Sequence, residues 1–261
     1  MSKFDLSVVI PAYNETARIG GTLYAALAYL APRSYSWELI VVDDGSHDGT
    51  ARVVAERIRR VPTARLISYS PNRGKGAAIR TGVLASRGER VLFCDADLST
   101  PFEELERLLA VLEDGYDIVI GSRAIEGACA VAPIWRRLGG LLFRLCRNGL
   151  IGLREFSDSQ CGFKLFRGDV ARRLFALQRI DRFMFDIEVL YLAQCLGYRI
   201  GESAVRWTHA EGGKVGFWDF SFNWMRDLAL IKWHHRSLGH VAAAPTSAGT
   251  EPRTAAATRQ E

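Results

Sequence analysis

The chain has 261 residues, of which 48% are hydrophobic and 24% are charged, and its formal net charge is +5. This length and composition suit one large α/β domain or two small ones with an ordinary globular core. The positive charge fits anionic ligands or an anionic membrane surface. It is too small and too dispersed to indicate a nucleic-acid-binding protein.

The cysteines and the apolar runs bear on the cellular compartment. The five cysteines are odd in number and form no C-x-x-C pair, which is typical of reduced cytosolic thiols. The apolar run Leu6–Ile10 is too short for a signal peptide and is followed by Pro11. No uninterrupted apolar run approaches the roughly 20 residues of a spanning helix. We therefore expect a cytoplasmic protein with, at most, peripheral membrane contact.

The first half of the chain alternates short apolar runs with helical periodicities. Each run is rich in β-favouring residues and ends in a polar turn, as expected of buried strands. The predicted strands are Leu6–Ile10, Glu38–Val42, Arg65–Tyr69 and Val91–Cys94, and the helices run through Ile19–Leu30, Val54–Ile58, Ile79–Val83 and Phe102–Leu112. This alternation predicts parallel βαβ units in a doubly wound α/β sheet, with the polar turns meeting at the carboxyl ends of the strands.

The second half of the chain is less regular. It contains predicted strands at Asp117–Ile120, Phe163–Phe166 and Tyr198–Arg206, and predicted helices at Pro133–Leu150, Val170–Leu177 and Phe185–Leu196. In the helix over 133–150, four leucines project to one side and Arg136, Arg137, Arg144 and Arg147 to another. Such a helix suits a bilayer interface. A core-facing helix with solvated arginines is the alternative.

The C-terminal part divides into an aromatic segment and a tail. Residues 217–238 carry Phe217, Phe220, Trp224, Leu228 and Ile231 at helical spacing, interrupted by charged residues. This pattern predicts an amphipathic helix that lies on a surface or a partner and does not span a membrane. From 241 onward the chain is Ala, Pro, Thr, Ser and Gly with scattered charge, which predicts a disordered tail over 241–261.

Two carboxylates, Asp95 and Asp97, follow the strand that begins at Val91. The carboxyl end of a strand in an open α/β sheet is where ligands bind. Carboxylates this close repel one another unless a cation lies between them, and a hard divalent ion that also takes water and substrate phosphates fits such oxygens. The pair therefore predicts a metal site for a diphosphate. The alternative is a turn in which Asp97 or Ser99 caps the helix that starts at Pro101.

Several of these turns resemble, in the same order, the motifs of glycosyltransferase family 2. The turns at 11–15, 42–46 and 72–76 resemble its nucleotide-binding loops, and Asp95-Ala96-Asp97 resembles its metal-binding motif. More narrowly, the segments 95–101, 121–123 and 158–166 look like the dolichyl-phosphate β-glucosyltransferase branch. The resemblance implies a GT-A (Rossmann-like) fold over 1–215, a mostly parallel sheet flanked by helices. The amphipathic pattern described above predicts a C-terminal interfacial helix over 216–240.

The resemblance also implies a donor-binding set. It comprises Pro11, Tyr13, Glu15, Asp43, Asp44, Gly74, Lys75, Asp95, Ala96, Asp97, Arg206 and Lys214. Asp44, supported by Asp43, would accept a hydrogen bond from the nucleobase or ribose, and the amides around Lys75 would meet a phosphate or a nucleobase carbonyl. Asp95 and Asp97 would bind Mg²⁺ or Mn²⁺, which neutralises charge on the leaving nucleotide. For the Asp-Asp-Gly-Ser sequence, an ordinary turn before a helix is the alternative.

Arg123 and Arg136 are the candidates for the acceptor phosphate, because a guanidinium group matches phosphate oxygens with two hydrogen bonds. Asp158 is the candidate base in the family pattern. A phosphate monoester is already largely ionised at neutral pH, so Asp158 could as well orient Arg136 or the sugar, and its role stays open. For each of these cations, Arg206 and Lys214 included, a solvated side chain is the alternative.

The resulting hypothesis is a metal-dependent inverting glycosyltransferase at the cytoplasmic face of a membrane. Its donor would be a nucleoside-diphosphate sugar, UDP-glucose first and GDP-mannose second, and its acceptor a polyprenyl (dolichyl) phosphate. The alternatives are a transferase for a hydrophilic glycan and an inactive scaffold that binds nucleotide sugars. Relatives often carry transmembrane helices at one end, whereas we expect none in this sequence. Its Gly212-Gly213-Lys214 stands where the family usually has Gly-Ser-Lys.

Overall fold

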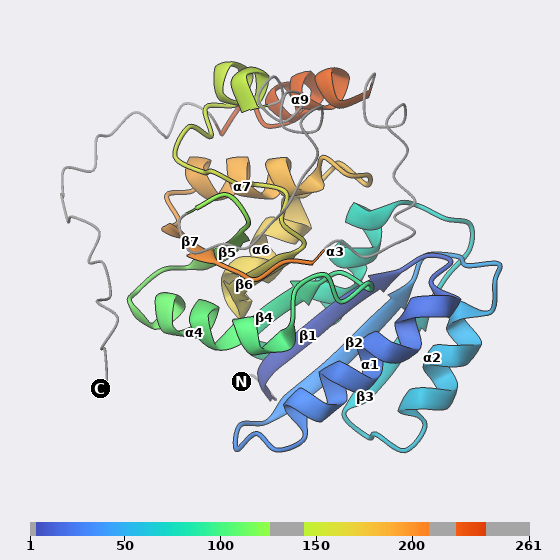
Figure 1. The fold of residues 1–261 in the computed structure, drawn as a ribbon. Coiled ribbons are helices and arrows are strands. Elements are labelled where there is room, and N and C mark those ends of the chain that lie inside the picture. The colour runs from blue at the N-terminus through green and yellow to red at the C-terminus, as the bar shows by residue number, and fades with distance from the viewer. Residues whose placement is uncertain (1–3, 126–143, 209–222, 239–261) are drawn as a thin grey trace, which may run out of the picture.

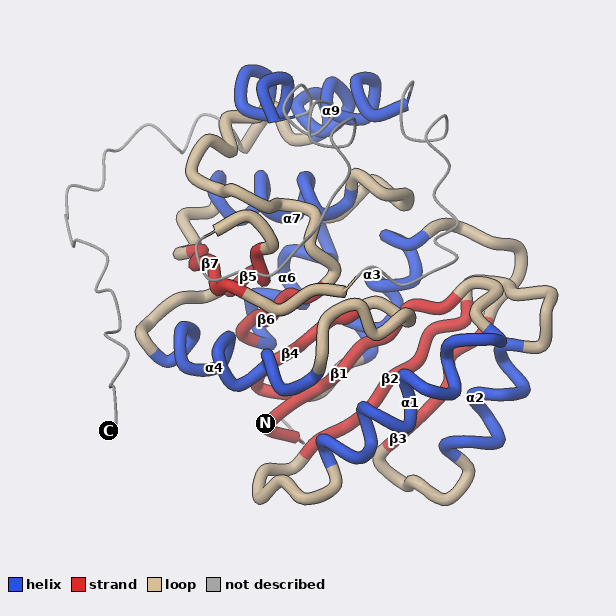
Figure 2. Tube along the Cα trace, in the orientation of Figure 1, coloured by secondary structure: helices blue, strands red, loops and turns tan. Residues whose placement is uncertain are grey.

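The computed structural model describes residues 4–125, 144–208 and 223–238. Within them, a seven-stranded sheet of order β3-β2-β1-β4-β6-β5-β7 lies between two layers of helices (Figure 1 and Figure 2). The strands are β1 (Phe4–Ala12), β2 (Trp37–Asp43), β3 (Ala64–Ser68), β4 (Gly88–Cys94), β5 (Ile118–Ser122), β6 (Phe163–Arg167) and β7 (Ile200–Ala204). All seven predicted strands are therefore confirmed.

The predicted helices are also present wherever the structure describes them. They are α1 (Thr16–Leu30), α2 (Thr50–Ile58), α3 (Lys75–Ala85), the 3-10 helix η1 (Phe102–Glu104), α4 (Leu105–Glu113), α6 (Gly168–Leu177), α7 (Phe185–Cys195) and α9 (Asn223–His234). Residues 144–150 are helical as well. The first part of the helix expected over 133–150, residues 217–222 and the expected tail lie outside the described residues.

The sheet is mostly parallel, as predicted, with one exception among the described strands. β6 pairs antiparallel with both β4 and β5, whereas the β1–β2, β1–β4, β2–β3 and β5–β7 pairs are parallel. In the β4–β6 register, Cys94 lies opposite Phe163. Because β6 runs in reverse, the turn before β6 meets the carboxyl end of β4, where the two aspartates follow.

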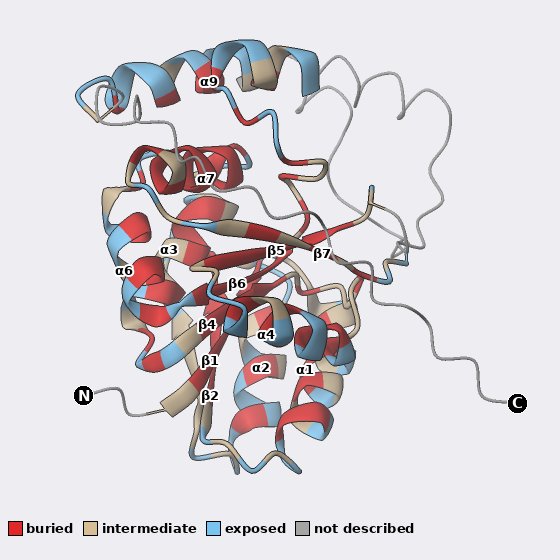
Figure 3. Cartoon of the chain, turned by 90° about the vertical axis from the view of Figure 1, so that its left-hand side faces the viewer, coloured by how far each residue is buried: buried red, intermediate tan, exposed pale blue. Residues whose placement is uncertain are grey.

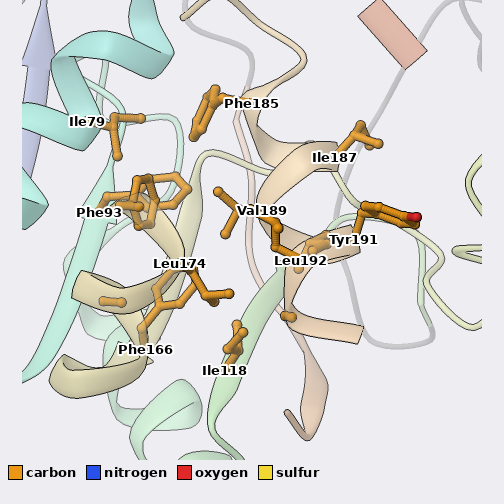
Figure 4. Close-up of a cluster of buried hydrophobic side chains, with 14 of the residues drawn as sticks. Ile79, Phe93, Ile118, Phe166, Leu174, Phe185, Ile187, Val189, Tyr191 and Leu192 are labelled. Carbon is orange, nitrogen blue, oxygen red and sulfur yellow. The ribbon is translucent and has the colours of Figure 1, made fainter. Parts of the chain in front are cut away.

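Each face of the sheet carries its own apolar core. Successive side chains of a strand point to opposite faces, and in β1 Val9 joins one buried cluster while Val8 and Ile10 join the other. Figure 3 shows the sheet nearly edge-on, with α3, α6 and α7 on one side and α1, α2 and α4 on the other. At the centre of the first cluster, the ring centroid of Phe93 lies 5.8–6.3 Å from those of Phe166, Phe175 and Phe185, and Phe166 lies 5.8 Å from Phe175. Figure 4 shows Phe93, Phe166 and Phe185 in this cluster.

This packing anchors the part of the sheet that carries the aspartates. Aromatic pairs at such distances contribute about 0.5–1.5 kcal/mol each beyond area burial, and Phe93 lies two residues before Asp95. β1 leads through α1 to β2 on one side, while β4 lies on the other side of β1. A crevice at the carboxyl ends of two such strands is the usual ligand site of an open α/β sheet. Within the described ranges, no helix is long and apolar enough to cross a bilayer.

Candidate functional site

Two adjacent cavities open at the carboxyl ends of β1 and β4. The larger has a volume of about 360 Å³ and is lined by the predicted residues Pro11, Tyr13, Glu15, Asp44, Gly74, Lys75, Asp95, Ala96 and Asp97, and also by Arg18, Asn72, Arg182 and Phe183. The smaller, of about 90 Å³, is lined among others by Asp95, Asp97, Ser99, Arg123, Gly162 and Trp207. Asp95 and Asp97 therefore line both cavities.

The structure does not bring all predicted site residues together. Asp43 is buried at the end of β2, where its Oδ1 lies 3.4 Å from the Ser46 amide, and it does not belong to the lining of either cavity. Arg206 follows β7 and pairs with the buried carboxylate of Glu104 away from both linings. Arg136 and Lys214 lie outside the described residues.

Asp44 uses both carboxylate oxygens to hold the loop before α3. Its Oδ1 accepts a hydrogen bond from the Arg73 amide at 2.8 Å, and its Oδ2 accepts from the Gly74 amide at 2.8 Å and from Asn72 Nδ2 at 2.7 Å. The side chain is buried. Sequence analysis predicted that the Asp44 carboxylate accepts a hydrogen bond from the nucleobase or ribose, but these three bonds already use much of its capacity as an acceptor. Asp44 thus shapes the larger cavity by fixing this loop.

The amino end of α3 packs closely against the segment before α7. Gly74 has a φ of +111°, and a Cβ at this position would lie 2.5 Å from the carbonyl oxygen of Asp181. The Ala77 amide donates to that same oxygen at 3.0 Å. Glycine is therefore required here by backbone conformation and by contact with a neighbouring segment. That segment adds Arg182 and Phe183 to the wall of the larger cavity.

Arg18 is a site residue that sequence analysis missed. Its Nε and Nη2 donate to the two carboxylate oxygens of Glu15, both at 2.7 Å, and the Glu15 amide donates to Thr50 Oγ1 at 2.8 Å. The hydrogen bond to Glu15 raises the pKa of Arg18, and the charges of Asp97 and Asp95 add to this effect. Arg18 thus fixes a positive charge near the aspartate pair. The available signal was its position three residues after Glu15, which lies directly before the first residue of α1.

Asp95 lies between an ammonium group and a backbone that tolerates no side chain. Lys75 Nζ is 2.6 Å from Asp95 Oδ1. On the other side, the Asp95 amide donates to the Gly162 carbonyl at 3.1 Å, and a Cβ on Gly162 would lie 2.0 Å from Asp95 Oδ2. Burial acts to lower the pKa of Lys75, but the charges of Asp95 and Asp186 outweigh it and the pKa is raised. Lys75 is therefore a charged partner of Asp95.

Asp97 belongs to a turn and does not cap the following helix. Its Oδ1 accepts a hydrogen bond from the Ser99 amide at 3.0 Å, and Leu98 between them has a φ of +55°, which is uncommon for leucine. The next helix, η1, has Pro101 as its N-cap and no side-chain cap bond. The alternative in which Asp97 or Ser99 caps this helix is therefore wrong.

The aspartate pair is compatible with a hard divalent ion. Among the described residues, no group of three or more His, Cys, Asp or Glu side chains is placed to hold a metal. Asp95 and Asp97 are the carboxylates that line both cavities, whereas Glu15 and Asp44 in the larger one are engaged by Arg18 and by the loop before α3. Mg²⁺ is commonly held by one or two carboxylates and completes its shell with water and substrate phosphates. The residues present thus fit an ion that binds together with a diphosphate.

Arg123 and Asp158 form a fork-to-fork ion pair beside the smaller cavity. Arg123 Nε donates to Asp158 Oδ2 at 2.6 Å, and Nη2 donates to Oδ1 at 2.9 Å. Burial acts to raise the pKa of Asp158, but the hydrogen bonds and charge of Arg123 hold it below its usual value. The Arg123 guanidinium also lies 5.4 Å from the ring of Trp207. Asp158 is therefore an ionised partner of Arg123 and a weak base.

A comparison with known families agrees with this arrangement. A sequence profile described as "Glycosyl transferase family 2" matches residues 7–175. The chain belongs to this family. Among its relatives are dolichyl-phosphate beta-glucosyltransferases. The one from Dictyostelium discoideum is 36% identical over 88% of this chain and 74% of its own length. The one from Mus musculus is 39% identical over 87% of this chain and 75% of its own length.

Solved structures of a glucosyl-3-phosphoglycerate synthase confirm the fold. Glucosyl-3-phosphoglycerate synthase from Mycobacterium tuberculosis, in complex with Mn²⁺, UDP and glucosyl-3-phosphoglycerate, matches with a TM-score of 0.66. The match covers 94% of this chain and 82% of that chain at 21% identity. At this identity the likeness concerns the fold alone, and it agrees with the predicted GT-A architecture.

This family 2 chain also carries a buried ion pair between Lys164 and Asp186. Lys164 Nζ, on β6, lies 2.6 Å from Asp186 Oδ1 at the start of α7 and donates to the Cys161 carbonyl at 2.6 Å. Both side chains are buried, at 1% and 5% exposure. Burial raises the pKa of Asp186 although Lys164 and Lys75 act to lower it. The sequence showed only a lysine inside an apolar strand, without its partner.

The arginine face predicted for the helix over 133–150 is wrong at one position. Arg144 is exposed, but Arg147 is 1% exposed and lies among the largest fully buried side chains. Leu145 and Leu150, on the same short helix, are exposed instead. Helical periodicity placed Arg147 with the other arginines, and it could not show that a polar turn from elsewhere in the chain receives this side chain.

Proposed function

We propose that this protein transfers glucose from UDP-glucose to a dolichyl or other polyprenyl phosphate and produces a β-linked lipid-phosphate sugar. One observation carries the proposal: Asp95 and Asp97 line two adjoining cavities, one built from the nucleotide-loop motifs and one beside a paired arginine. The relatives' names supply the sugar and the acceptor. The glucosyl-3-phosphoglycerate synthase, which has a similar fold, binds UDP-glucose together with Mn²⁺, and this supports UDP-glucose as the donor.

The larger cavity is the proposed donor site. Its volume of about 360 Å³ lies at the lower end of the range usual for small-molecule sites. Tyr13 and Phe183 contribute aromatic surface, while Arg18 and Lys75 contribute positive charge near the aspartates. A nucleoside diphosphate needs both kinds of surface, one for its base and one for its phosphates.

Asp95 and Asp97 would hold Mg²⁺ or Mn²⁺ at this site. When bound, such an ion neutralises the charge that grows on a leaving nucleoside diphosphate. Lys75 already places a positive charge 2.6 Å from Asp95 Oδ1, and Gly162 keeps the Asp95 carboxylate in place. The chain itself therefore limits the repulsion between the aspartates and the phosphates of the donor.

The smaller cavity is the proposed acceptor-phosphate site. Arg123 uses Nε and Nη2 for Asp158, so that its orientation is set before a phosphate arrives. Arg136 is proposed as the second phosphate ligand on the basis of the sequence. A phosphate oxygen forms the bond to the anomeric carbon, and the carbon–oxygen bond to UDP breaks with its electron pair leaving on UDP. A phosphate dianion has no proton to lose, which fits an Asp158 that orients Arg123 instead of acting as a base.

Peripheral contact with the cytoplasmic face of a membrane would bring the lipid to this site. Exposed apolar side chains lie on the helix over 144–150 and on α9, namely Leu145, Leu150, Met225 and Trp233. Figure 1 places both helices at the same end of the molecule, beyond α7. Apolar side chains beside arginines suit an interfacial helix.

The test is transfer of radiolabelled sugar into organic-extractable lipid. The assay uses a short polyprenyl phosphate, Mg²⁺ or Mn²⁺, and UDP-glucose beside GDP-mannose, with the Asp97→Asn variant and Asp114→Asn as an exposed control. We expect metal-dependent product from UDP-glucose that is lost in Asp97→Asn and kept in Asp114→Asn. Donor hydrolysis without a lipid product, together with no binding to vesicles, would overturn the lipid acceptor and favour a water-soluble one.

A further inference from the structure

Arg147 is a buried charge whose hydrogen-bond acceptors among the described residues are all uncharged. Its Nη1 donates to Ser159 Oγ at 2.8 Å, and its Nη2 donates to the Phe156 carbonyl at 2.7 Å. Both Nε and Nη2 also donate to Asn148 Oδ1, at 3.0 and 2.8 Å. The side chain is 1% exposed. Each acceptor within the described residues is thus a carbonyl, a hydroxyl or an amide oxygen.

Burying this guanidinium is unfavourable for the fold. Burial lowers the pKa of Arg147, and repulsion from Arg144 adds to this effect. The charges of Glu202 and Asp158 act to raise the pKa but do not outweigh burial, and neither carboxylate accepts a hydrogen bond from Arg147 within the described residues. Buried charges in proteins are normally paired with an opposite charge. An apolar side chain of similar length would fill the space without this cost. The arrangement therefore calls for a role in holding specific polar groups.

The groups that Arg147 holds stand on both sides of Asp158. Phe156 lies two residues before Asp158, and Ser159 follows it directly. From the opposite direction, Glu202 on β7 accepts hydrogen bonds from the Ser157 and Asp158 amides at 3.0 and 3.1 Å. One cation and one anion thus fix the same turn, each through several bonds.

We propose that Arg147 is a positioning residue for the acceptor side of the site, holding the turn that places Asp158 and, through Asp158, the guanidinium of Arg123. The proposal rests on the proposed function, in which Arg123 binds the acceptor phosphate. Under this proposal the two faces of the helix over 144–150 have different roles. Leu145 and Leu150 are exposed on one face, and Arg147, buried on the other, sets the geometry of the phosphate site.

The test compares Arg147→Met and Arg147→Lys with the wild-type protein. Arg154→Met is the matched control, because Arg154 is an exposed arginine between the same helix and the same turn. A displacement of about 1 Å costs about 100-fold in rate, so kcat/KM for the lipid acceptor falls about 100-fold in Arg147→Met through a higher acceptor KM. UDP affinity by calorimetry stays within about twofold. Arg147→Lys, which keeps a donor cation, recovers part of the loss.

A double-mutant cycle separates positioning from general stability. If Arg147 acts through Asp158, the Arg147→Met/Asp158→Asn pair loses about as much activity as the worse single variant, because coupled residues are not additive. Should Arg147→Met fail to fold, Ser159→Ala removes one of the same bonds and the cycle is run with it. Additive losses, or an unchanged acceptor KM, would overturn the positioning role. Lack of lipid transfer by the wild-type protein would instead refute the proposed function, and the positioning role with it.

Discussion

Gly162→Ala is the most direct test of how the site is assembled. A Cβ at this position would lie 2.0 Å from Asp95 Oδ2 and 2.3 Å from Asp95 Cγ. Non-bonded heavy atoms settle at about 3.5 Å, so the carboxylate must move by roughly 1.5 Å. Gly162 belongs to the turn before β6, and Asp95 follows β4. The variant therefore perturbs a contact between two segments that are distant in sequence.

The effect on activity should far exceed the effect on stability. The Asp95 side chain is 34% exposed and can turn toward solvent, so the loss of its ion pair with Lys75 costs at most about 1 kcal/mol. That corresponds to a fall in Tm of about 2–4 °C for a chain of this size. A catalytic group displaced by about 1 Å costs about 100-fold in rate. We therefore expect kcat/KM to fall by about that factor, with a weaker affinity for Mn²⁺.

The assay follows lipid-linked product, Mn²⁺ binding by calorimetry and thermal unfolding in parallel. Gly21→Ala on α1 is the control, because a Cβ there meets nothing within 4 Å. It should leave activity unchanged and stabilise the helix by about 0.5–1 kcal/mol. If Gly162→Ala kept wild-type Mn²⁺ affinity and activity, the placement of Asp95 by this turn would be refuted.

Three further substitutions test other parts of the site. Asp44→Asn places an amide group opposite the backbone N–H donors of Arg73 and Gly74. Urea unfolding should show a free energy of unfolding lower by about 1–3 kcal/mol, and UDP binding should weaken. An unchanged free energy of unfolding and unchanged UDP affinity would contradict the structural role of Asp44. Lys164→Met leaves the Asp186 carboxylate buried without its partner and should cost about 3–5 kcal/mol; the double variant with Asp186→Leu should recover part of it. For Asp48, burial acts to raise the pKa, but hydrogen bonds from Thr50 and Thr16 hold it at about 2, below the usual 3.8. Its contribution is therefore present above pH 3.8 and lost as the pH falls through about 2, so Asp48→Asn should be less stable than wild type at pH 6 and equal to it below pH 2.

The elements and their alternation could be predicted because they depend on neighbours in sequence. Apolar runs ending in polar turns identified β1, β2 and β4, and the polar turns do meet around the larger cavity. Nothing local indicated that β6 runs antiparallel between β4 and β5. Strand order depends on contacts between distant segments, and this order is what brings Gly162 against Asp95.

Sequence analysis identified several polar side chains of the site by their chemical type, but it could not predict which groups they contact. The sequence identified Asp44 and Lys75 as ligand-binding groups, while the structure shows that the first holds a loop and the second pairs with Asp95. It placed Arg147 on an exposed face, although two of its hydrogen-bond acceptors, Phe156 and Ser159, lie nine and twelve residues away in sequence. Periodicity shows which face of a helix a residue occupies, but not what covers that face.

The predicted motif residues therefore fall into two groups: those whose polar atoms bind other parts of the protein, and those whose polar atoms face the cavities. The carboxylate of Asp44 is used by the backbone of the protein, so its loss should appear first as a loss of stability. Asp97 accepts a hydrogen bond from the Ser99 amide with one carboxylate oxygen, and its side chain lines both cavities. Substitution of Asp97 should therefore abolish metal-dependent activity in a protein that still folds. Asp158 stands between these cases, because it orients the Arg123 side chain and also accepts hydrogen bonds from the Arg123 and Gln160 amides. Asp158→Asn should therefore raise the acceptor KM and lower the free energy of unfolding by about 1–3 kcal/mol, while UDP binding stays close to that of the wild-type protein.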